Sequence, residues 1–499
     1  MRRVGPLRAQ ARSSAVLLAL SLAACTIGPD YSREAAPVPT QFKELKGWRA
    51  ARPGDQMDRG AWWAPYRDAK LDLLLKQVEI SNQTVAAAAA SYEQAKAIVR
   101  EAQAALFPTV SGSYNFSRSR TGPQANGSGG GRGLTNSAGA IYATTYTAQA
   151  SGTWDIDVWG KVRRQIESNI AAAQASEADL ENAKLSAQAQ LATAYFDLRA
   201  ADSLADLLRR TIEEYKRTLT ITQNQYNAGV VSRADVITAQ TQVLTVQAQL
   251  ISIGVTRAQF EHSIAMLTGR PPAELTIAPH LLSGGIPKIP VAVPSLLLER
   301  RPDIAAAERT MQEQNALVGV ALAAYYPDVS LNPSATFVGA IPLPFSAAHA
   351  IWAFGASATD TIFDGGLRGA QVDAAKAFYW QSVANYRQTV LTAFQQVEDQ
   401  LAAIRILTQQ LAVEREAVKA AREAVAINLN QYQAGTVAFT AVVTAEATLL
   451  GDEEAELTVR QNLFLASVAL IEALGGGWDV TLLPSNNDLS KGFSLLPQL

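Results

Sequence analysis

The chain has 499 residues, a formal net charge of −2 and a single cysteine. This near-neutral balance excludes a basic nucleic-acid-binding surface, and one cysteine excludes an intrachain disulfide. The three histidines are scattered without metal-ligand spacing, and the sequence has no phosphate loop, nucleophile elbow or zinc-protease motif. We therefore expect no nucleic-acid partner, no metal, no other cofactor and no enzymatic activity.

The first residues have the order of an export signal. Four arginines come before the apolar run 15–22, which is too short to span a bilayer, and small residues and Cys25 follow it. The segment resembles a bacterial lipobox, which implies lipid on Cys25, and Thr26 after it implies the outer membrane. The alternative is an ordinary signal peptide with a chance cysteine. We predict a signal peptide over 1–24 and a lipidated N-terminal arm over 25–69.

The next segments change from a helical to a strand pattern. Residues 70–106 show helical periodicity, and Pro108 ends that helix. In 107–158 apolar and polar residues alternate, which predicts two strands, each with one apolar and one polar face, joined by a Gly-rich loop. The predicted apolar face comprises Val110, Gly112, Tyr114 and Phe116 in the first strand and Tyr142, Tyr146, Ala148, Ala150, Trp154 and Ile156 in the second.

A long helical hairpin is predicted over 159–270. Its first helix would run from residue 161 to residue 227, which is roughly 100 Å at the usual rise per residue. The returning helix would run over 233–267. Neither helix has an internal stop, which favours coiled-coil-like packing. A proline-rich linker over 271–295 follows.

The rest of the chain repeats this plan. It comprises a helix, two strands, a second long hairpin and a tail, over 296–325, 326–364, 365–474 and 475–499. The clearest echo joins Gln225–Gln240 and Gln431–Glu446, where eight of sixteen positions match at a spacing of 206 residues. Each copy contains a glycine that can end a helix without steric cost. Each therefore predicts the tip of a hairpin, and together they indicate a duplication.

These patterns predict a mixed α and β membrane protein with long α-helical hairpins and four transmembrane strands per chain. No apolar run is long enough for a transmembrane helix. Strands can cross a bilayer only as a closed barrel with an apolar outer face. Four strands cannot close around a channel, so several chains would share one barrel. The alternative is a soluble four-stranded sheet with one buried face.

Further motifs complete a family resemblance. They are LLERRPDIAAAE at 297–308, Asp-Gly-Gly at 364–366, the two QY-x-AG tips and LGGGW at 474–478. With the lipobox and the doubled plan, they make the chain similar to the TolC/OprM family. The closest resemblance is to its lipoprotein branch, the NodT-type outer-membrane factors of RND efflux systems. The resemblance covers essentially the whole mature chain.

The resemblance implies a homotrimeric exit duct of a tripartite efflux pump that passes small molecules or drugs. A twelve-stranded β-barrel in the outer membrane would be continued by an α-helical barrel through the periplasm, with an equatorial belt built from the terminal segments and the linker. The implied partners are a periplasmic adaptor protein, an inner-membrane RND pump and outer-membrane lipid. The alternatives are the duct of a type I protein secretion system and a lipid-anchored coiled-coil tether without a pore.

The resemblance also implies functional residues at the two tips. The residues that would meet the adaptor are Gly229, Val230, Gly435 and Thr436, and a helix cap alone is the alternative role of either glycine. The residues that would form the gate or line the pore are Asp235, Tyr432, Thr440 and Thr444. For Asp235 the alternative is a solvated helix charge.

Two gate positions depart from the family pattern. Val437 stands where relatives carry a basic link residue, and Thr444 stands where they carry an aspartate of an acidic ring. A ring of carboxylates repels itself and binds cations, and a ring of threonines does neither. We therefore expect a weak charge gate with little cation block.

Overall fold

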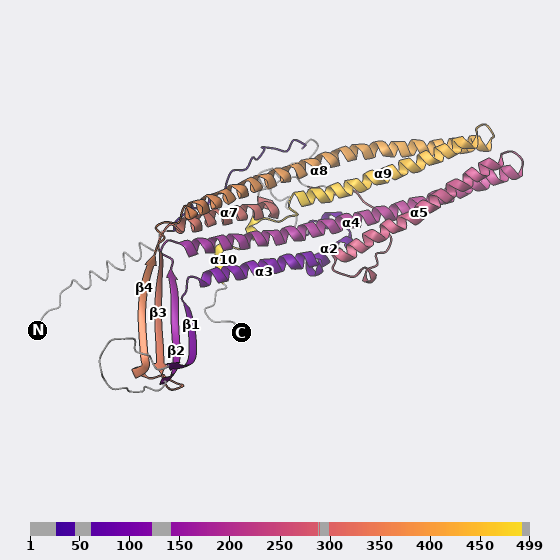
Figure 1. Cartoon of the computed structure of the whole chain (residues 1–499). Helices are drawn as coiled ribbons and strands as arrows, with labels where there is room; N and C mark the ends of the chain where they lie inside the picture. The colour runs from indigo at the N-terminus through magenta and orange to yellow at the C-terminus, as the bar shows by residue number, and fades with distance from the viewer. Residues whose placement is uncertain (1–25, 45–60, 122–140, 288, 290–298, 492–499) are drawn as a thin grey trace, which may run out of the picture.

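The computed structural model describes residues 26–44, 61–121, 141–287, 289 and 299–491. The predicted signal peptide, Cys25, the Gly-rich loop and part of the proline-rich linker lie outside these residues. The molecule is elongated, with a β-sheet at one end and the tips of two helical hairpins at the other (Figure 1). Within the described residues, no helix has both the length and the apolar character needed to cross a membrane.

The sheet has four antiparallel strands in the order β1-β2-β3-β4. Their bounds are Thr109–Thr121 for β1, Ile141–Ile156 for β2, Asp328–Gly339 for β3 and Ala350–Thr359 for β4. Consecutive strands are neighbours, and the pairing of β2 with β3 joins the two copies of the repeat into one sheet.

The register places the predicted apolar residues on one face of this sheet. Phe116 lies opposite Tyr146, and across the next pair Ala150 lies opposite Ala335. The other face is polar, and across it the hydroxyls of Ser111 and Ser151 lie 2.9 Å apart. Trp352 and Phe354 on the apolar face are 79% and 66% exposed, so the part of this face on β4 is open among the described residues. The alternation predicted from the sequence is confirmed.

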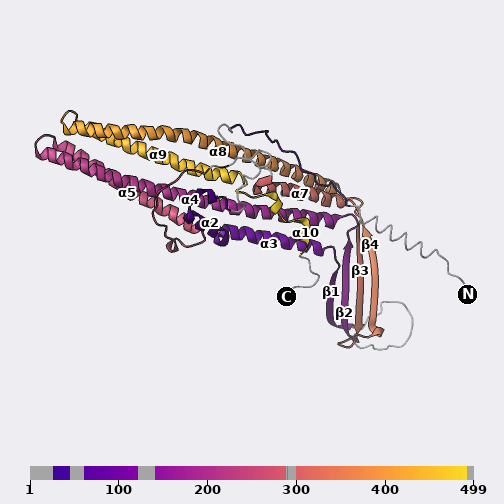
Figure 2. The same ribbon diagram turned by 180° about the vertical axis from the view of Figure 1, so that it is seen from behind.

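The two long hairpins have matching dimensions. The outgoing helices α4 (Lys161–Asn227) and α8 (Leu367–Gln433) each contain 67 residues, and the returning helices α5 (Arg233–Leu267) and α9 (Phe439–Ala473) each contain 35. The shorter helices α3 (Gln83–Ala104) and α7 (Pro302–Ala323) each contain 22. These equal lengths support the predicted duplication. Both tips point away from the sheet, as the view from behind also shows (Figure 2).

The helix predicted over 70–106 is instead two helices, α2 (Ala69–Ser81) and α3. The break lies at Asn82, whose side-chain oxygen accepts hydrogen bonds from the N–H groups of Thr84 and Val85 at 2.9 and 3.1 Å. Its amide also donates to the carbonyl of Leu267 at 2.8 Å, at the end of α5. The break therefore combines a local helix cap with a contact to a distant helix, and no glycine or proline marks it in the sequence. The tail also contains a short helix, α10 (Asn486–Ser490), that the periodicity did not predict.

The main hydrophobic core lies midway along the helices. There α2, the N-terminal arm and the segment after α5 pack against α4 and α8, and the largest fully buried side chains include Phe42, Trp62, Leu75, Tyr195 and Tyr386. A buried hydrogen bond also joins these segments: the Trp62 indole donates to the side chain of Gln188 in α4 at 3.0 Å. This equatorial core holds the two hairpins together and leaves their distal halves to pack on each other.

Candidate gating and docking site at the hairpin tips

Each hairpin reverses through the same glycine-centred turn. Gly229 has a φ of +74°, its N–H donates to the carbonyl of Tyr226, and the N–H of Val230 donates to the carbonyl of Gln225, both at 2.9 Å. These two bonds form a Schellman cap, which requires a left-handed residue that glycine adopts without strain. Apart from its two chain neighbours, no described residue has a heavy atom within 4 Å of a Cβ placed on Gly229. The glycine is therefore required by the backbone, and the turn is open to a partner.

The second tip has the same backbone. Gly435 also has a φ of +74°, and the N–H groups of Gly435 and Thr436 donate to the carbonyls of Tyr432 and Gln431 at 3.0 and 2.9 Å. In the described part of the chain, a Cβ on Gly435 would likewise meet no heavy atom within 4 Å beyond its two chain neighbours. All four residues predicted to meet an adaptor are thus exposed at one end of the molecule.

The helices that leave the two turns begin differently. In the first copy, Ser232 and Asp235 form a reciprocal capping box, in which the N–H of Ser232 donates to the Asp235 carboxylate at 3.1 Å. The second copy has Ala438 and Ala441 at the matching positions, and α9 starts without a side-chain cap. The Asp235 carboxylate therefore caps the start of α5, and the second tip lacks an equivalent side-chain cap.

In the second copy an aromatic contact takes the place of that cap. The rings of Tyr432 and Phe439 lie 5.3 Å apart, and Tyr432 is only 3% exposed. The Tyr432 hydroxyl lies 3.5 Å from the Thr222 hydroxyl of α4, and burial raises the pKa of Tyr432. Within the chain, the ring of Tyr432 thus lies in the core between the two hairpins.

Thr440 and Thr444 lie one turn apart on the exposed face of α9. The Thr444 hydroxyl donates to the carbonyl of Thr440 at 2.8 Å, and the Thr448 hydroxyl repeats this contact with Thr444 at 2.9 Å. The result is an uncharged, hydroxyl-bearing stripe that starts at the tip. The structure therefore separates the predicted gate residues into a buried tyrosine, a capping aspartate and an exposed threonine stripe.

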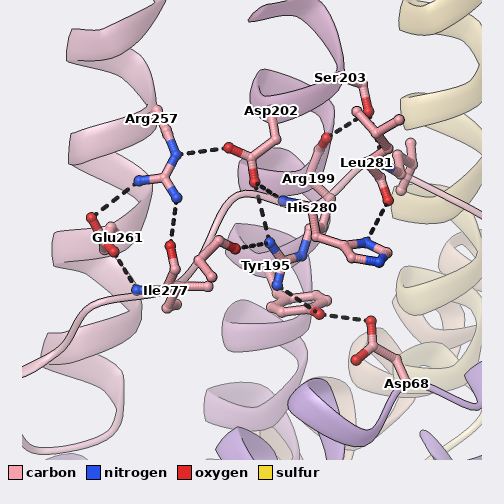
Figure 3. Close-up of polar contacts among 12 residues, drawn as sticks. Asp68, Tyr195, Arg199, Asp202, Ser203, Arg257, Glu261, Ile277, His280 and Leu281 are labelled. Atoms are coloured by element: carbon pink, nitrogen blue, oxygen red, sulfur yellow. Dashed lines mark hydrogen bonds and ion pairs between the residues drawn. The ribbon is translucent and has the colours of Figure 1, made fainter. Parts of the chain in front are cut away.

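Sequence reasoning missed a buried ionic network at the other end of the first hairpin (Figure 3). Asp202, whose side chain is 3% exposed, bonds to Arg199 at 3.1 Å and to Arg257 at 2.7 Å. It also accepts the backbone N–H of His280 at 2.9 Å. Arg257 donates to the carbonyl of Ile277 at 2.6 Å. The network fastens the segment after α5 to the hairpin, and no local sequence pattern marks these residues.

The second copy has an arginine at the position that matches Arg199, but this arginine binds a different segment. Arg405 lies 206 residues after Arg199 and forms an ion pair with Glu44 of the N-terminal arm. Thr408 stands where the first copy has Asp202. Each copy thus uses the same arginine position to hold a different equatorial segment.

Comparison with known proteins places this architecture in a family. The family model for the outer membrane efflux protein matches residues 74–270 and 293–476. The probable efflux pump outer membrane protein TtgC of Pseudomonas putida is 29% identical over 468 residues, which are 93% of this chain and 95% of TtgC. The cation efflux system protein CusC of Escherichia coli is 26% identical over 467 residues, 92% of this chain and 97% of CusC.

A solved structure extends the likeness to three dimensions. The outer-membrane channel OprN is 29% identical and superposes with a TM-score of 0.82, covering 91% of this chain and all of the OprN chain. The chain therefore belongs to the outer membrane efflux protein family, and it is an outer-membrane channel of an efflux pump.

Proposed function

We propose that three copies of this chain form one continuous duct that carries small molecules from the periplasm through the outer membrane. The observation that carries the proposal is that both the sheet and the helical layer end in free edges. Within the described residues, β1 and β4 each pair on one side only. In a bilayer every backbone polar group needs a partner, so these edges must meet those of other copies. Three copies supply a closed sheet of twelve strands.

The helical layer has free edges of the same kind. Its helices lie in the order α5, α4, α9, α8 in both views (Figures 1 and 2). The two edge helices carry exposed apolar residues seven positions apart, Ile237, Leu244 and Ile251 on α5 and Ile406, Val413 and, after Ala420, Ile427 on α8. Heptad spacing is typical of a coiled-coil seam. We infer that α5 of one copy packs against α8 of the next and closes the tube.

The start of the described chain supports a lipid anchor at Cys25. The N–H of Ile27 donates to the carbonyl of Trp159 at 3.1 Å, and Thr26 packs against Gly160, where β2 gives way to α4. An acyl chain on Cys25 would therefore begin at the membrane end of the helices. Each buried CH₂ contributes about 0.8 kcal/mol, so such a lipid would strengthen attachment to the outer membrane.

We propose that the hairpin tips are the periplasmic end, where an adaptor protein docks and connects the duct to an inner-membrane RND pump. The open turns at Gly229 and Gly435, with Val230 and Thr436 beside them, provide the contact surface. Thr440 and Thr444 would face the entrance, Asp235 would stabilise the first tip, and Tyr432 would brace the second against α4. The names of TtgC and CusC point to different pump systems, so they favour no particular cargo for this duct.

Recording from purified full-length protein in planar bilayers tests this proposal. We expect a trimer that conducts, and Leu244→Asp is expected to destroy both the trimer and the current by placing a charge in the seam. Gln249→Asp introduces the same charge at an exposed position of α5 and is the matched control. A monomer without current would refute the duct and favour the tether. A Leu244→Asp trimer that conducts normally would refute the proposed seam.

A further inference from the structure

A cavity lies between the two hairpins in the distal half of the molecule. Its volume is about 160 Å³, and it is lined by residues of α4, α8 and α9, among them Tyr215, Thr218, Leu429, Glu446 and Leu449. Thr218 comes nine residues before the end of α4, which places the cavity roughly 14 Å from the tip. The cavity therefore bridges the first hairpin and the second close to the proposed gate.

Glu446 is the unusual group in this cavity. Its side chain is buried, with the residue 5% exposed, and one carboxyl oxygen accepts a hydrogen bond from the Thr218 hydroxyl at 2.6 Å. The other oxygen, Oε2, is buried and has no hydrogen-bond partner among the described residues. A buried carboxyl oxygen without a donor is destabilising, because it has given up its hydrogen bonds to water and gained none in return. The site would therefore gain from a bound group that donates a hydrogen bond there.

The surrounding charges favour a positive group. Glu214 of α4 and Glu453 of α9 line the same cavity, and Arg217 of α4 is the basic residue of its lining. On the α8 side, Arg422 is already paired with Glu453. Burial, with a smaller contribution from Glu214, raises the pKa of Glu446. A positively charged group at Oε2 would therefore complement the acidic residues that line the cavity.

The remaining walls are apolar and limit what the cation can be. Val425, Leu429, Leu449 and Leu450 line the cavity together with the ring of Tyr215. A hydrated metal ion needs several oxygen ligands, and the described residues contain no cluster of three metal-ligating side chains. Pockets for drug-sized ligands are about 300–1,000 Å³, so this cavity accepts only a fragment. The ligand must join a small apolar body to a hydrogen-bonding positive group.

We propose that this cavity is a binding site for a compact organic cation, such as a primary ammonium or an amidinium on a small ring or short alkyl chain. Its N–H groups donate to Glu446 Oε2, and its apolar part contacts Leu429 and Leu449. The matching position in the first copy is Gln240, which is exposed, so the first copy has no equivalent of this buried carboxyl there. Because the site joins α4 to α8 and α9, the bound cation holds the distal halves of the hairpins together.

Titration calorimetry on the detergent-solubilised full-length protein tests this site with benzylammonium as the probe. Two controls separate the contributions. Benzyl alcohol has the same aromatic ring but no charge, and magnesium is a cation without an apolar group. We expect benzylammonium to bind more tightly than either. Its affinity should rise with pH above the ordinary carboxyl pKa of 4.5, as Glu446 releases its proton to the buffer. Benzyl alcohol binding equally well, magnesium displacing the probe, or no heat from benzylammonium would each overturn the proposal.

Variants assign the binding to this carboxyl. Glu446→Gln keeps the shape of the side chain and should weaken benzylammonium at least about tenfold, which corresponds to about 1.4 kcal/mol. Glu416→Gln makes the same charge change at an exposed position of α8 and should leave the affinity unchanged. Leu429→Phe fills the cavity without altering Glu446 and should also abolish binding, which provides a second test if Glu446→Gln fails to fold. Unchanged affinity in a folded Glu446→Gln or Leu429→Phe protein would refute the assignment.

Discussion

Removal of the Asp202 carboxylate should release the segment after α5 from the first hairpin. In Asp202→Ala the guanidinium groups of Arg199 and Arg257 lose their shared anion, and the N–H of His280 loses its acceptor. Breaking a buried ion pair from one side costs about 3–5 kcal/mol. Arg257 retains Glu261 as a partner, and Arg199 retains the carbonyl of Ala278. We therefore expect Asp202→Ala to destabilise the closed state of this segment by about 3 kcal/mol, the lower limit of that range.

This cost should appear as local opening of the segment 275–282. A change of about 3 kcal/mol raises the open population roughly a hundredfold, since each 1.4 kcal/mol is a factor of ten. Limited proteolysis under conditions where opening is fast relative to cleavage reports that population, and mass spectrometry locates the cut. We expect cleavage in this segment to accelerate by about two orders of magnitude.

Asp206→Ala provides the matched control on the same helix. Asp206 pairs with Arg210 one turn away, and both side chains are largely exposed, at 39% and 62%. Exposed pairs of this kind contribute about 0.3–0.5 kcal/mol, so cleavage should change by less than about threefold. If Asp202→Ala is cleaved no faster than Asp206→Ala, the network does not hold this segment and the reasoning fails.

Three further predictions concern the tips. Thr444→Asp should create block by divalent cations in single-channel recordings, because it places a carboxylate in the threonine stripe, and strong block of the unaltered protein would contradict the weak charge gate. Gly435→Ala should lower the free energy of unfolding by about 1 kcal/mol, because Gly435 has a φ of +74°. Gly254→Ala inside α5 should raise it by about the same amount, because alanine is the better helix former. Hydrogen exchange measures both changes, and equal effects of the two variants would contradict the Schellman assignment. Burial raises the pKa of Glu446 above 4.5, so the contribution of Glu446 to folding stability is largest below that pH and decreases as the pH rises. Hydrogen-exchange protection factors at the tip should therefore decrease with pH, and Glu446→Gln should weaken this pH dependence. An unchanged pH dependence in Glu446→Gln would refute the prediction.

The sequence by itself determined the features that depend on local periodicity. The change from a period of 3.6 to a period of two located the strands, and the alternation identified the apolar face that the register later brought together. The echo at Gln225–Gln240 and Gln431–Glu446 located both tips, because a left-handed glycine after a helix has a strong local signature. Equal helix lengths followed from the duplication.

The tertiary structure alone decided which of the polar side chains are buried. The Asn82 side chain is buried against the end of α5, and the burial of Tyr432, Glu446 and Asp202 depends on the helix or segment that packs opposite each of them. These partners are many residues away in the chain, so no periodicity records the contact. The repeated stretch therefore predicts the backbone of both tips. The consequences of the sequence differences between its two copies depend on how the two hairpins pack against each other.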